Sequence, residues 1–286
     1  MSPALVVARL VVREVLRRRL VLALLALTLV AIVLTAWGFS RIPTLTTRGV
    51  PIGDVQVKAI SAFLLILVMF MFSNVLALSA VFIAAPSISG DVESGIAQAV
   101  LSRPLPRAAF VIGKWLGLAL LVAAYAVLAA LIELLVVNAV VGYAPPRPLE
   151  LLLFLFAEGL VLLTLGTLLS TRLSGMVGGV IALVLFGMAW LGGIVGGIGS
   201  AFENDVVEGV GIATKLVLPT DALWRGAVWA LQPEALRAGG AAFGPAAAAN
   251  PFYQPSAPPA AYLVWCGLWT AGMLALAVWS FDRREV

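Results

Sequence analysis

The sequence predicts an all-α membrane protein with six transmembrane helices, and two observations lead to this fold class. First, hydrophobic residues make up 62% of the 286 residues, whereas charged residues make up 11%. Soluble domains average about 45–50% apolar and about 25% charged residues, so a soluble core could not bury this much apolar surface. Second, the apolar residues fall into six long runs, and a helix that crosses the bilayer needs about 20 of them.

Two of the connections between the six predicted spans are short turns. The third and fourth spans meet at a proline-rich turn, Tyr143-Ala-Pro-Pro-Arg-Pro148, and the fourth and fifth meet at Thr171-Arg-Leu-Ser-Gly175. The predicted spans cover about 20–40, 59–85, 110–141, 150–170, 176–199 and 260–281.

Residues 3–19 precede the first span with helical periodicity. Arg9, Arg13 and Arg17 recur every four residues, which places them on one face of a helix. Such a basic amphipathic helix lies in the membrane interface, with its arginines toward anionic lipid headgroups. The alternative is an ordinary positive flank of the first span. A cleaved signal peptide is not expected, because the apolar run continues past the roughly 7–15 residues of a signal core.

Lysine and arginine counts predict the orientation of the spans, because short cytoplasmic loops carry an excess of both residues. If the N-terminus is cytoplasmic, eleven of these residues lie inside and four lie in the short outer loops. Both termini are therefore predicted to be cytoplasmic. The inner set is Arg9, Arg13, Arg17, Arg18, Arg19, Arg103, Arg107, Lys114, Arg172, Arg283 and Arg284, and the outer set is Arg41, Arg48, Lys58 and Arg147.

A long outer segment, residues 200–259, separates the fifth and sixth spans. Its first half contains a short predicted helix near 220–232 that opens with Thr220 or Asp221 as N-cap. The helix presents an apolar face and is expected to lie on the outer leaflet, either as a lid that gates an exit or as a static anchor. Residues 238–259, rich in Ala, Gly and Pro, are predicted to form a loosely packed loop. The candidate outer-gate residues are Trp224, Val228 and Leu231.

The residue inventory excludes most catalytic chemistry. The chain has no His and one Cys, Cys266, so His-based catalysis, a disulfide within the chain and a thiolate metal cluster are excluded. Gly113-Lys114 lacks the other residues of a phosphate-binding loop, so the chain is not expected to bind ATP itself. We predict no enzyme activity, no cofactor, no metal site and no nucleic-acid binding on this chain, since its basic residues flank the spans.

Two acidic residues lie at membrane depth, Glu133 in the third span and Glu158 in the fourth. An ionised carboxylate there costs about 2.5–3.5 kcal/mol on insertion scales, so such residues face protein or water. Together with Asn74 and Asn138 they are candidates for a polar translocation path. The alternative is structural, with hydrogen-bonded carboxyls that join helices. Glycines of the fifth span indicate close helix packing, with a dimer seam or a hinge as the alternative.

Between the second and third spans, residues 89–103 are predicted to form one short amphipathic helix. Ser89 or Asp91 would cap its start, Glu93 complements the positive end of its dipole, and prolines stop it. Its apolar ridge, made of Val92, Ile96, Ala99 and Val100, suits insertion into a groove on a partner protein. The alternative is a helix that rests on the inner leaflet.

This region carries a family resemblance. Gly90-Asp-Val-Glu-Ser-Gly95, Leu101-Ser-Arg-Pro-Leu-Pro-Arg107 and Phe110-Val-Ile-Gly-Lys-Trp115 resemble the coupling region of type-2 ABC exporter permeases. Leu218-Pro-Thr-Asp-Ala-Leu-Trp-Arg225 resembles the outer segment of the subgroup that contains the copper-maturation permeases of nitrous oxide reductase. The Ala- and Pro-rich residues 238–259 depart from that pattern. The resemblance assigns Asp91, Glu93, Ser94 and Gly95 to the ATPase-docking region. We add Ile96 of the ridge and Arg103 beside the proline stop as candidate docking residues.

The resemblance implies a single permease domain over residues 1–286, in the cytoplasmic membrane, that exports cargo from the cytoplasm or the inner leaflet. It also implies a dimer, as a homodimer or a heterodimer, with each copy docked on a separate ATPase that binds ATP and Mg²⁺. One alternative is a non-transporting membrane anchor or assembly factor coupled to an ATPase. A proton-coupled secondary transporter is the weaker alternative, because the sequence shows no inverted repeat.

Overall fold

The computed structural model of the chain describes residues 2–17, 19–47, 49–102, 105–240, 244, 247 and 249–284. Within these residues the structure is almost entirely helical, and six helices are long and apolar enough to cross a membrane. The predicted fold class is therefore confirmed. The helices at the six spans are α2 (Arg19–Ser40), α3 (Asp54–Ala84), α6 (Arg107–Val141), α7 (Pro148–Ser170), α8 (Gly175–Ala201) and α12 (Ala260–Asp282).

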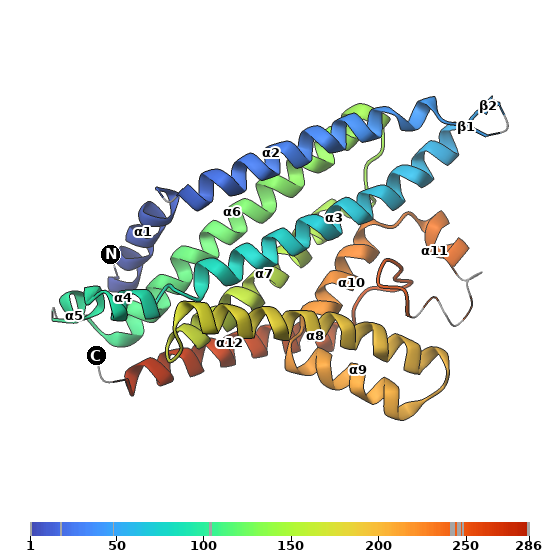
Figure 1. Ribbon diagram of the computed structural model, residues 1–286. Coiled ribbons are helices and arrows are strands. Elements are labelled where there is room, and N and C mark those ends of the chain that lie inside the picture. Colours follow the sequence, from blue (N-terminus) through green and yellow to red (C-terminus); the bar gives the residue numbers. More distant parts are fainter. Residues whose placement is uncertain are drawn as a thin grey trace.

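The helices form an elongated bundle with two distinct ends (Figure 1). Both chain termini lie at one end, beside the short helices α4 (Ser89–Glu93) and α5 (Ile96–Leu101), and we call this the terminal end. Helices α9 (Asp205–Val217) and α11 (Glu234–Gly240) lie toward the other end, which we call the opposite end. The opposite end also carries a 3₁₀ turn (Ile42–Thr44) and an antiparallel hairpin of β1 (Thr46–Thr47) and β2 (Val50–Pro51).

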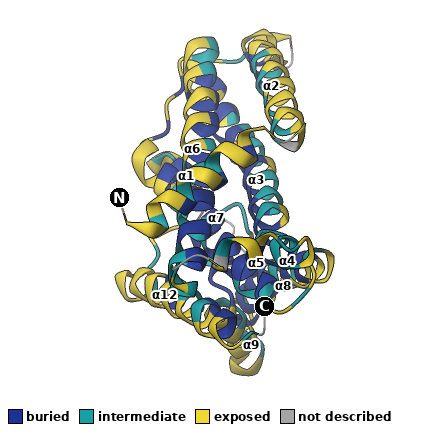
Figure 2. Cartoon of the chain, turned by 90° about the vertical axis from the view of Figure 1, so that its left-hand side faces the viewer, coloured by how far each residue is buried: buried dark blue, intermediate teal, exposed yellow. Residues whose placement is uncertain are grey.

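Helix α7 occupies the centre of the bundle and packs against α3, α6, α10 (Thr220–Leu231) and α12. In its most apolar stretch 67% of the residues are buried within the chain, compared with 6% for the first span. Figure 2 shows the same gradient, with buried residues along α7 and α3 and exposed residues along α2. Because lipid can cover an apolar surface as well as protein can, the exposed apolar faces of α2 fit a helix at the membrane-facing edge.

The N-terminal helix α1 (Pro3–Leu16) is confirmed as an amphipathic helix, and its apolar side covers the start of α6. Its buried residues recur every four positions, while Arg9 and Arg13 are exposed. Gly113 and Gly117 of α6 make the close approach possible. A Cβ at Gly113 would lie 2.6 Å from the Ala4 carbonyl oxygen, so a larger residue there would push α1 away. The buried residues of α1 are Val7, Val11 and Val15.

The predicted role of the α8 glycines in packing is confirmed. Helix α9 folds back along α8, and a Cβ at Gly196 would lie 2.7 Å from the Cα atom of Gly211 in α9. A Cβ at Gly192 would collide with the side chain of Thr214. The glycines therefore serve helix packing within the chain. Helix α9 was not among the elements predicted from the sequence.

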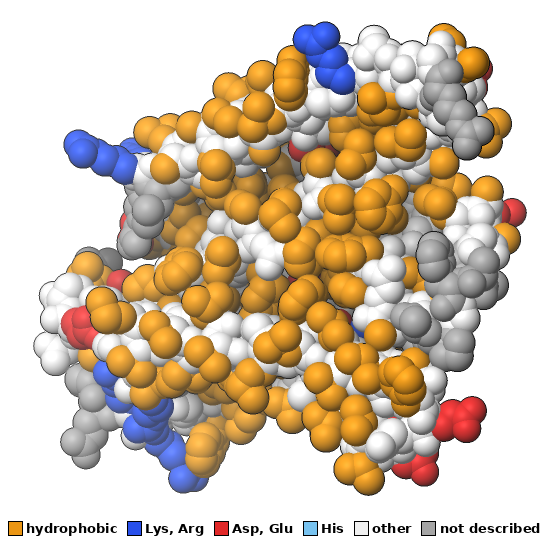
Figure 3. All heavy atoms as spheres, turned by 45° about the vertical axis from the view of Figure 1, so that its right-hand side comes forward, with side chains coloured by type: hydrophobic (Ala, Val, Ile, Leu, Met, Phe, Trp, Pro, Cys, Tyr) orange, Lys and Arg blue, Asp and Glu red, His pale blue; other side chains and the backbone are white. Residues whose placement is uncertain are grey.

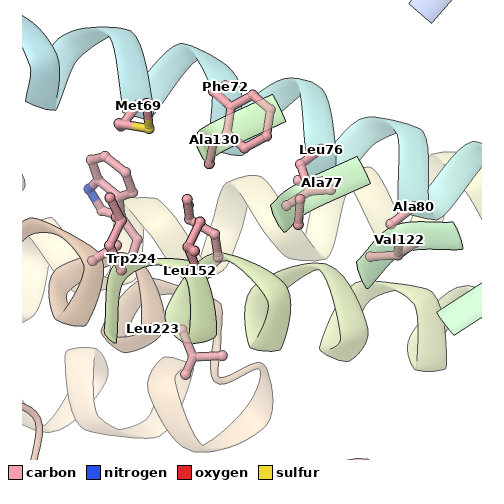
Figure 4. Packing of buried hydrophobic residues seen from close by; sticks show 14 of the residues in the cluster. Met69, Phe72, Leu76, Ala77, Ala80, Val122, Ala130, Leu152, Leu223 and Trp224 are labelled. Carbon is pink, nitrogen blue, oxygen red and sulfur yellow. The ribbon is translucent and has the colours of Figure 1, made fainter. Parts of the chain in front are cut away.

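Helix α10 corrects the prediction of a helix on the outer leaflet. The helix exists where it was predicted, but Trp224, Val228 and Leu231 are all buried inside the protein, and Leu223 on another side of the helix is buried as well. Figure 4 shows Trp224 between the ribbons of α3 and α7. The prediction of a surface helix is wrong, because α3, α7 and α8 surround α10 where we expected lipid headgroups on one side. Its N-cap is Pro219, and neither predicted capping residue plays that role.

Part of the predicted loose loop is also held in place. The indole Nε1 of Trp224 donates to the carbonyl oxygen of Pro251 at 3.0 Å. The side-chain amide of Gln232 donates to the carbonyl oxygen of Phe252 at 3.0 Å. Residues 251 and 252 are therefore fixed against α10, whereas 241–243, 245, 246 and 248 of the predicted loop lie outside the described residues.

Arginines tie the terminal ends of several spans together. Arg107, at the start of α6, donates to the carbonyl oxygen of Asp282 at 2.9 Å. Arg172, between α7 and α8, donates to the carbonyl oxygen of Ser280 at 2.8 Å. These bonds join α6, α7 and α12 near the terminal end. Helices α4 and α5 therefore lie beside spans that are fixed to one another.

Candidate functional site

The predicted coupling segment is two short helices and not one. Helix α4 ends at Glu93 and α5 begins at Ile96, with Gly95 between them at a φ angle of +75°. Glycine adopts this left-handed conformation without the steric penalty of a side chain, so Gly95 turns the chain between the helices. The single helix over 89–103 is therefore a wrong prediction. The capping prediction is also wrong, since Ile88 is the N-cap and the Ser89 hydroxyl donates to the carbonyl oxygen of Ala85 at 3.2 Å.

Only part of the predicted ridge faces outward. Ala97 is fully buried, whereas the Ile96 side chain is 52% exposed. Ile96 and Ala99 of the ridge are exposed, while Val92 and Val100 are half-buried. The exposed residues define what we call the coupling surface: Glu93, Ser94, Ile96, Gln98 and Ala99. Arg103, predicted to belong to this region, lies outside the described residues.

Asp91 differs from the other predicted docking residues because its carboxylate is engaged within the chain. It forms an ion pair with Lys114, whose Nζ atom also donates to the carbonyl oxygen of Ser87 at 2.5 Å. The Lys114 side chain is 7% exposed and that of Asp91 is 18% exposed. This ion pair fastens α4 to the start of α6, so we assign Asp91 to positioning the coupling surface. The Gly113-Lys114 pair, which only resembled a nucleotide motif, thus has a structural role.

Glu133 is buried, as the sequence predicts, and faces the first span. The hydroxyl of Thr35 in α2 donates to Glu133 Oε1 at 3.0 Å. Its second oxygen, Oε2, is buried and has no hydrogen-bond partner among the described residues. The acid therefore joins α6 to α2 with half of its hydrogen-bonding capacity unused. Asn138, predicted to share its path, is exposed on another side of α6.

Glu158 is buried on the other side of the bundle. The hydroxyl of Ser73 in α3 donates to Glu158 Oε2 at 2.5 Å. Asn74, next to Ser73, lines a small cavity together with Glu158, while Glu133 and Asn138 do not line it. The structure therefore separates the four predicted polar residues, and it brings together Asn74 and Glu158.

The structure also shows a buried charge cluster that the sequence analysis missed as a site. Arg225 donates through Nε to Asp221 Oδ2 at 3.0 Å, and through Nη2 to the carbonyl oxygen of Gly193 at 3.0 Å. Lys215 of α9 lies 3.8 Å from the same carboxylate oxygen. A side chain at Gly193 would occupy the position of the Asp221 carboxylate. The signal was present as an acid and a base four residues apart in α10.

Charge and burial act in opposite directions on Lys215. Burial lowers the pKa of Lys215, because the charged amine is desolvated, while the neighbouring Asp221 carboxylate raises it. Lys215 and Arg225 also line a cavity of about 380 Å³ at the opposite end, which we call the outer cavity. The charge cluster therefore borders this cavity beside the buried part of α10.

The surface agrees with a membrane environment. Figure 3 shows hydrophobic side chains across the middle of the face in view, with charged side chains toward its margins. Helix α6 has 35 residues. At about 1.5 Å per residue a helix of this length exceeds a hydrocarbon layer of about 30 Å. The bundle is therefore long enough to hold the coupling surface outside the apolar layer.

These features define a multi-pass membrane protein with a braced helical protrusion at the end that carries both termini. Comparison with known families gives a match to the ABC-2 family transporter protein over residues 12–286, nearly the whole chain. The chain belongs to the ABC-2 family of transporters, and it is a permease subunit of an ABC transporter. Comparison with curated proteins gives no match.

Proposed function

We propose that this permease exports cargo from the cytoplasm or the inner leaflet, using ATP hydrolysed by a separate ATPase that docks on the coupling surface. The observation that supports docking is the exposure of Ile96 and its acidic neighbour Glu93 on a protrusion braced by the Asp91–Lys114 ion pair. An apolar surface rimmed by polar residues, here Ile96 and Ala99 beside Glu93, Ser94 and Gln98, is typical of a surface that binds a partner. In this proposal ATP and Mg²⁺ bind the partner ATPase.

The proposal includes the orientation and the assembly. We propose that the terminal end lies in the cytoplasm, in accordance with the Lys and Arg counts, and that the membrane is the cytoplasmic (inner) membrane. Two permease copies would pair, as a homodimer or with a related chain, and each would carry one ATPase. We also propose the subgroup of copper-maturation permeases, supported by the similarity of Leu218-Pro-Thr-Asp-Ala-Leu-Trp-Arg225.

Docking is tested by changing Glu93→Arg and Ile96→Arg together. Both side chains are exposed, so the permease should fold normally while the ATPase is lost from the detergent-solubilised complex. Loss of a central contact of about 2 kcal/mol or more weakens binding roughly 30-fold.

The matched control is Leu149→Arg with Glu150→Arg, an exposed apolar and acidic pair at the start of α7, at the other end of the bundle. This control should retain the ATPase. Intact co-purification of the Glu93 and Ile96 variant would show that the ATPase docks elsewhere. Release by both variants would point to a general folding defect.

The alternative functions predict different energetics. A non-transporting anchor or assembly factor would support ATP hydrolysis without flux of cargo, whereas an exporter shows ATP-dependent flux in vesicles. A secondary transporter would respond to a proton gradient in the absence of the ATPase. We favour transport over an anchor because the chain matches the ABC-2 family of transporters, and we favour ATP over a proton gradient because the coupling surface offers an ATPase a point of contact.

We further propose that Glu133 contributes to the translocation path, since one of its carboxylate oxygens is buried and unpartnered. Glu133→Gln can keep the Thr35 hydrogen bond, so the complex should assemble. Transport should fall about tenfold or more, because a charged hydrogen bond is worth about 1.5–3 kcal/mol. Vesicle flux per assembled complex is the measurement. Thr35→Val is the control, since it removes the observed hydrogen bond and keeps the carboxylate. Normal flux in Glu133→Gln would mean that Glu133 serves packing alone.

The residues of the candidate outer gate lie inside the bundle and not on the membrane surface. Trp224, Val228 and Leu231 belong to the core, so a gate built on them would have to shift α10 within the bundle. We propose this internal movement in place of a lid on the membrane surface.

A further inference from the structure

A small closed cavity lies where α10 meets the spans. It has about 10 Å³ available to the centre of a water-sized molecule. Polar cavities need roughly 10–15 Å³ by this measure to hold one water. Its lining comes from α3, α7, α8 and α10, and we call it the inner cavity. The residues that line it are Phe70, Ser73, Asn74, Glu158, Phe186, Trp190, Thr220, Asp221 and Trp224.

Three polar atoms on the lining residues are buried and have no hydrogen-bond partner among the described residues. They are the Nε1 atom of Trp190, the Oγ1 atom of Thr220 and the Oδ1 atom of Asp221. Thr220 is 1% exposed and Asp221 is 2% exposed. Buried polar groups in folded proteins are paired with protein or with ordered water in the great majority of cases. Three such atoms around one cavity indicate a missing common partner.

The chemistry of the three atoms restricts that partner. The indole N–H of Trp190 can only donate a hydrogen bond, so the occupant must accept one. A carboxylate oxygen of Asp221 can only accept, so the occupant must also donate one. The hydroxyl of Thr220 can do either. Water meets all three requirements and fits the volume, whereas a bare cation cannot accept a hydrogen bond from the indole.

We propose that the inner cavity is a binding site for a single water molecule, which accepts a hydrogen bond from Trp190 and donates to Asp221, with Thr220 as a third partner. This inference does not depend on the proposed export function. The water joins α8 to the first turn of α10. Asp221 Oδ2 is already bonded to Arg225, and Oδ1 is left for the water.

The site lies between two groups of polar contacts in the bundle. On one side, Ser73 and Glu158 join α3 to α7. On the other, Arg225 pairs with Asp221, joins α10 to α8 through the carbonyl oxygen of Gly193, and borders the outer cavity. With the water in place, the polar groups run from Glu158 toward the outer cavity. Helix α10 is thereby held by a solvent bridge as well as by its apolar side chains.

The test is a high-resolution map of the full-length chain in lipid nanodiscs, at a resolution that resolves ordered water. We expect one solvent peak within about 3.2 Å of both Trp190 Nε1 and Asp221 Oδ1. In a second map, of the Thr220→Val and Trp190→Phe double variant, the peak should be lost. Valine keeps the shape of threonine, and phenylalanine keeps a ring without the N–H donor.

An empty cavity in the wild-type map, beside other ordered buried waters, would overturn the proposal, and this outcome requires no variant to fold. A second measurement distinguishes a cation. Exchanging sodium for choline at constant ionic strength should leave the melting temperature of the wild type unchanged if water occupies the site. A melting temperature that rises with sodium in the wild type, but not in the double variant, would assign the cavity to a cation and contradict the water site.

Discussion

Helices α5 and α10 are a natural comparison within this molecule. Both are short helices in the connections between spans, and the sequence suggested for both an apolar face with one surface-exposed side. In α5 the apolar residue Ile96 is 52% exposed, whereas in α10 the apolar residues Val228 and Leu231 are fully buried. The same kind of local pattern therefore has opposite environments at the two ends of the bundle.

The difference lies in what surrounds each helix. Helix α10 is enclosed by spans that diverge enough to admit it, and the absence of a side chain at Gly193 leaves room for the carboxylate of Asp221. Helix α5 turns relative to α4 at Gly95, and it packs on the bundle through Ala97 and Val100 while Ile96 faces outward. An amphipathic pattern thus predicts that one face will be covered, but the neighbours decide whether the other face is free.

Among the variants that test this comparison, Asp221→Ala is expected to have the largest effect on stability. The change removes the carboxylate that pairs with the buried Arg225, and breaking a buried pair from one side costs about 3–5 kcal/mol. We expect a matching loss in the free energy of unfolding in detergent. The control is Glu234→Ala, whose side chain is 88% exposed and whose ion pair with Arg237 is 3.6 Å long. Similar losses in both variants would mean that the buried Asp221–Arg225 pair stabilises the fold no more than an exposed ion pair does.

A smaller effect is expected from Gly196→Val, which tests how tightly the bundle is packed toward its opposite end. A Cβ there would lie 2.7 Å from the backbone of Gly211, so α9 must move away. Overpacking of this kind costs about 1–3 kcal/mol. Gly187→Val is the matched control in the same helix, since nothing lies within 4 Å of a Cβ at that position. Equal thermal stability of the two variants would contradict the close α8–α9 packing.

The smallest effect compares the two helices directly, through Val228→Ala in α10 and Ile96→Ala in α5. Val228 loses two buried methyl groups at about 0.8 kcal/mol each, so its variant should be less stable by about 1–2 kcal/mol. Ile96→Ala should change stability by less than about 0.5 kcal/mol, because the residue is exposed. Denaturant unfolding of the two variants in the absence of the ATPase is the measurement. A loss as large for Ile96→Ala would mean that Ile96, and not only Ala97 and Val100, packs against the bundle in solution.

The sites were predictable to different degrees. Burial of Glu133 and Glu158 could be predicted because a carboxylate facing lipid is costly whatever the fold. Their partners could not, since Thr35 and Ser73 are 98 and 85 residues away along the chain. The break at Gly95 was missed because an isolated glycine is tolerated in a helix pattern, and its positive φ is set by the packing around it.

The sequence by itself determined the six spans, the amphipathic N-terminal helix and the existence of helices near 89–101 and 220–231, because hydropathy and periodicity are properties of neighbouring residues. Only the tertiary structure decided which faces are covered, that α9 folds back on α8 and that Asp221 and Arg225 form a buried pair against Gly193. The physical reason is that burial, pairing and cavities depend on residues far apart in the chain. Lipid accepts apolar side chains from every direction, so hydropathy alone does not distinguish a face that meets lipid from one that meets protein.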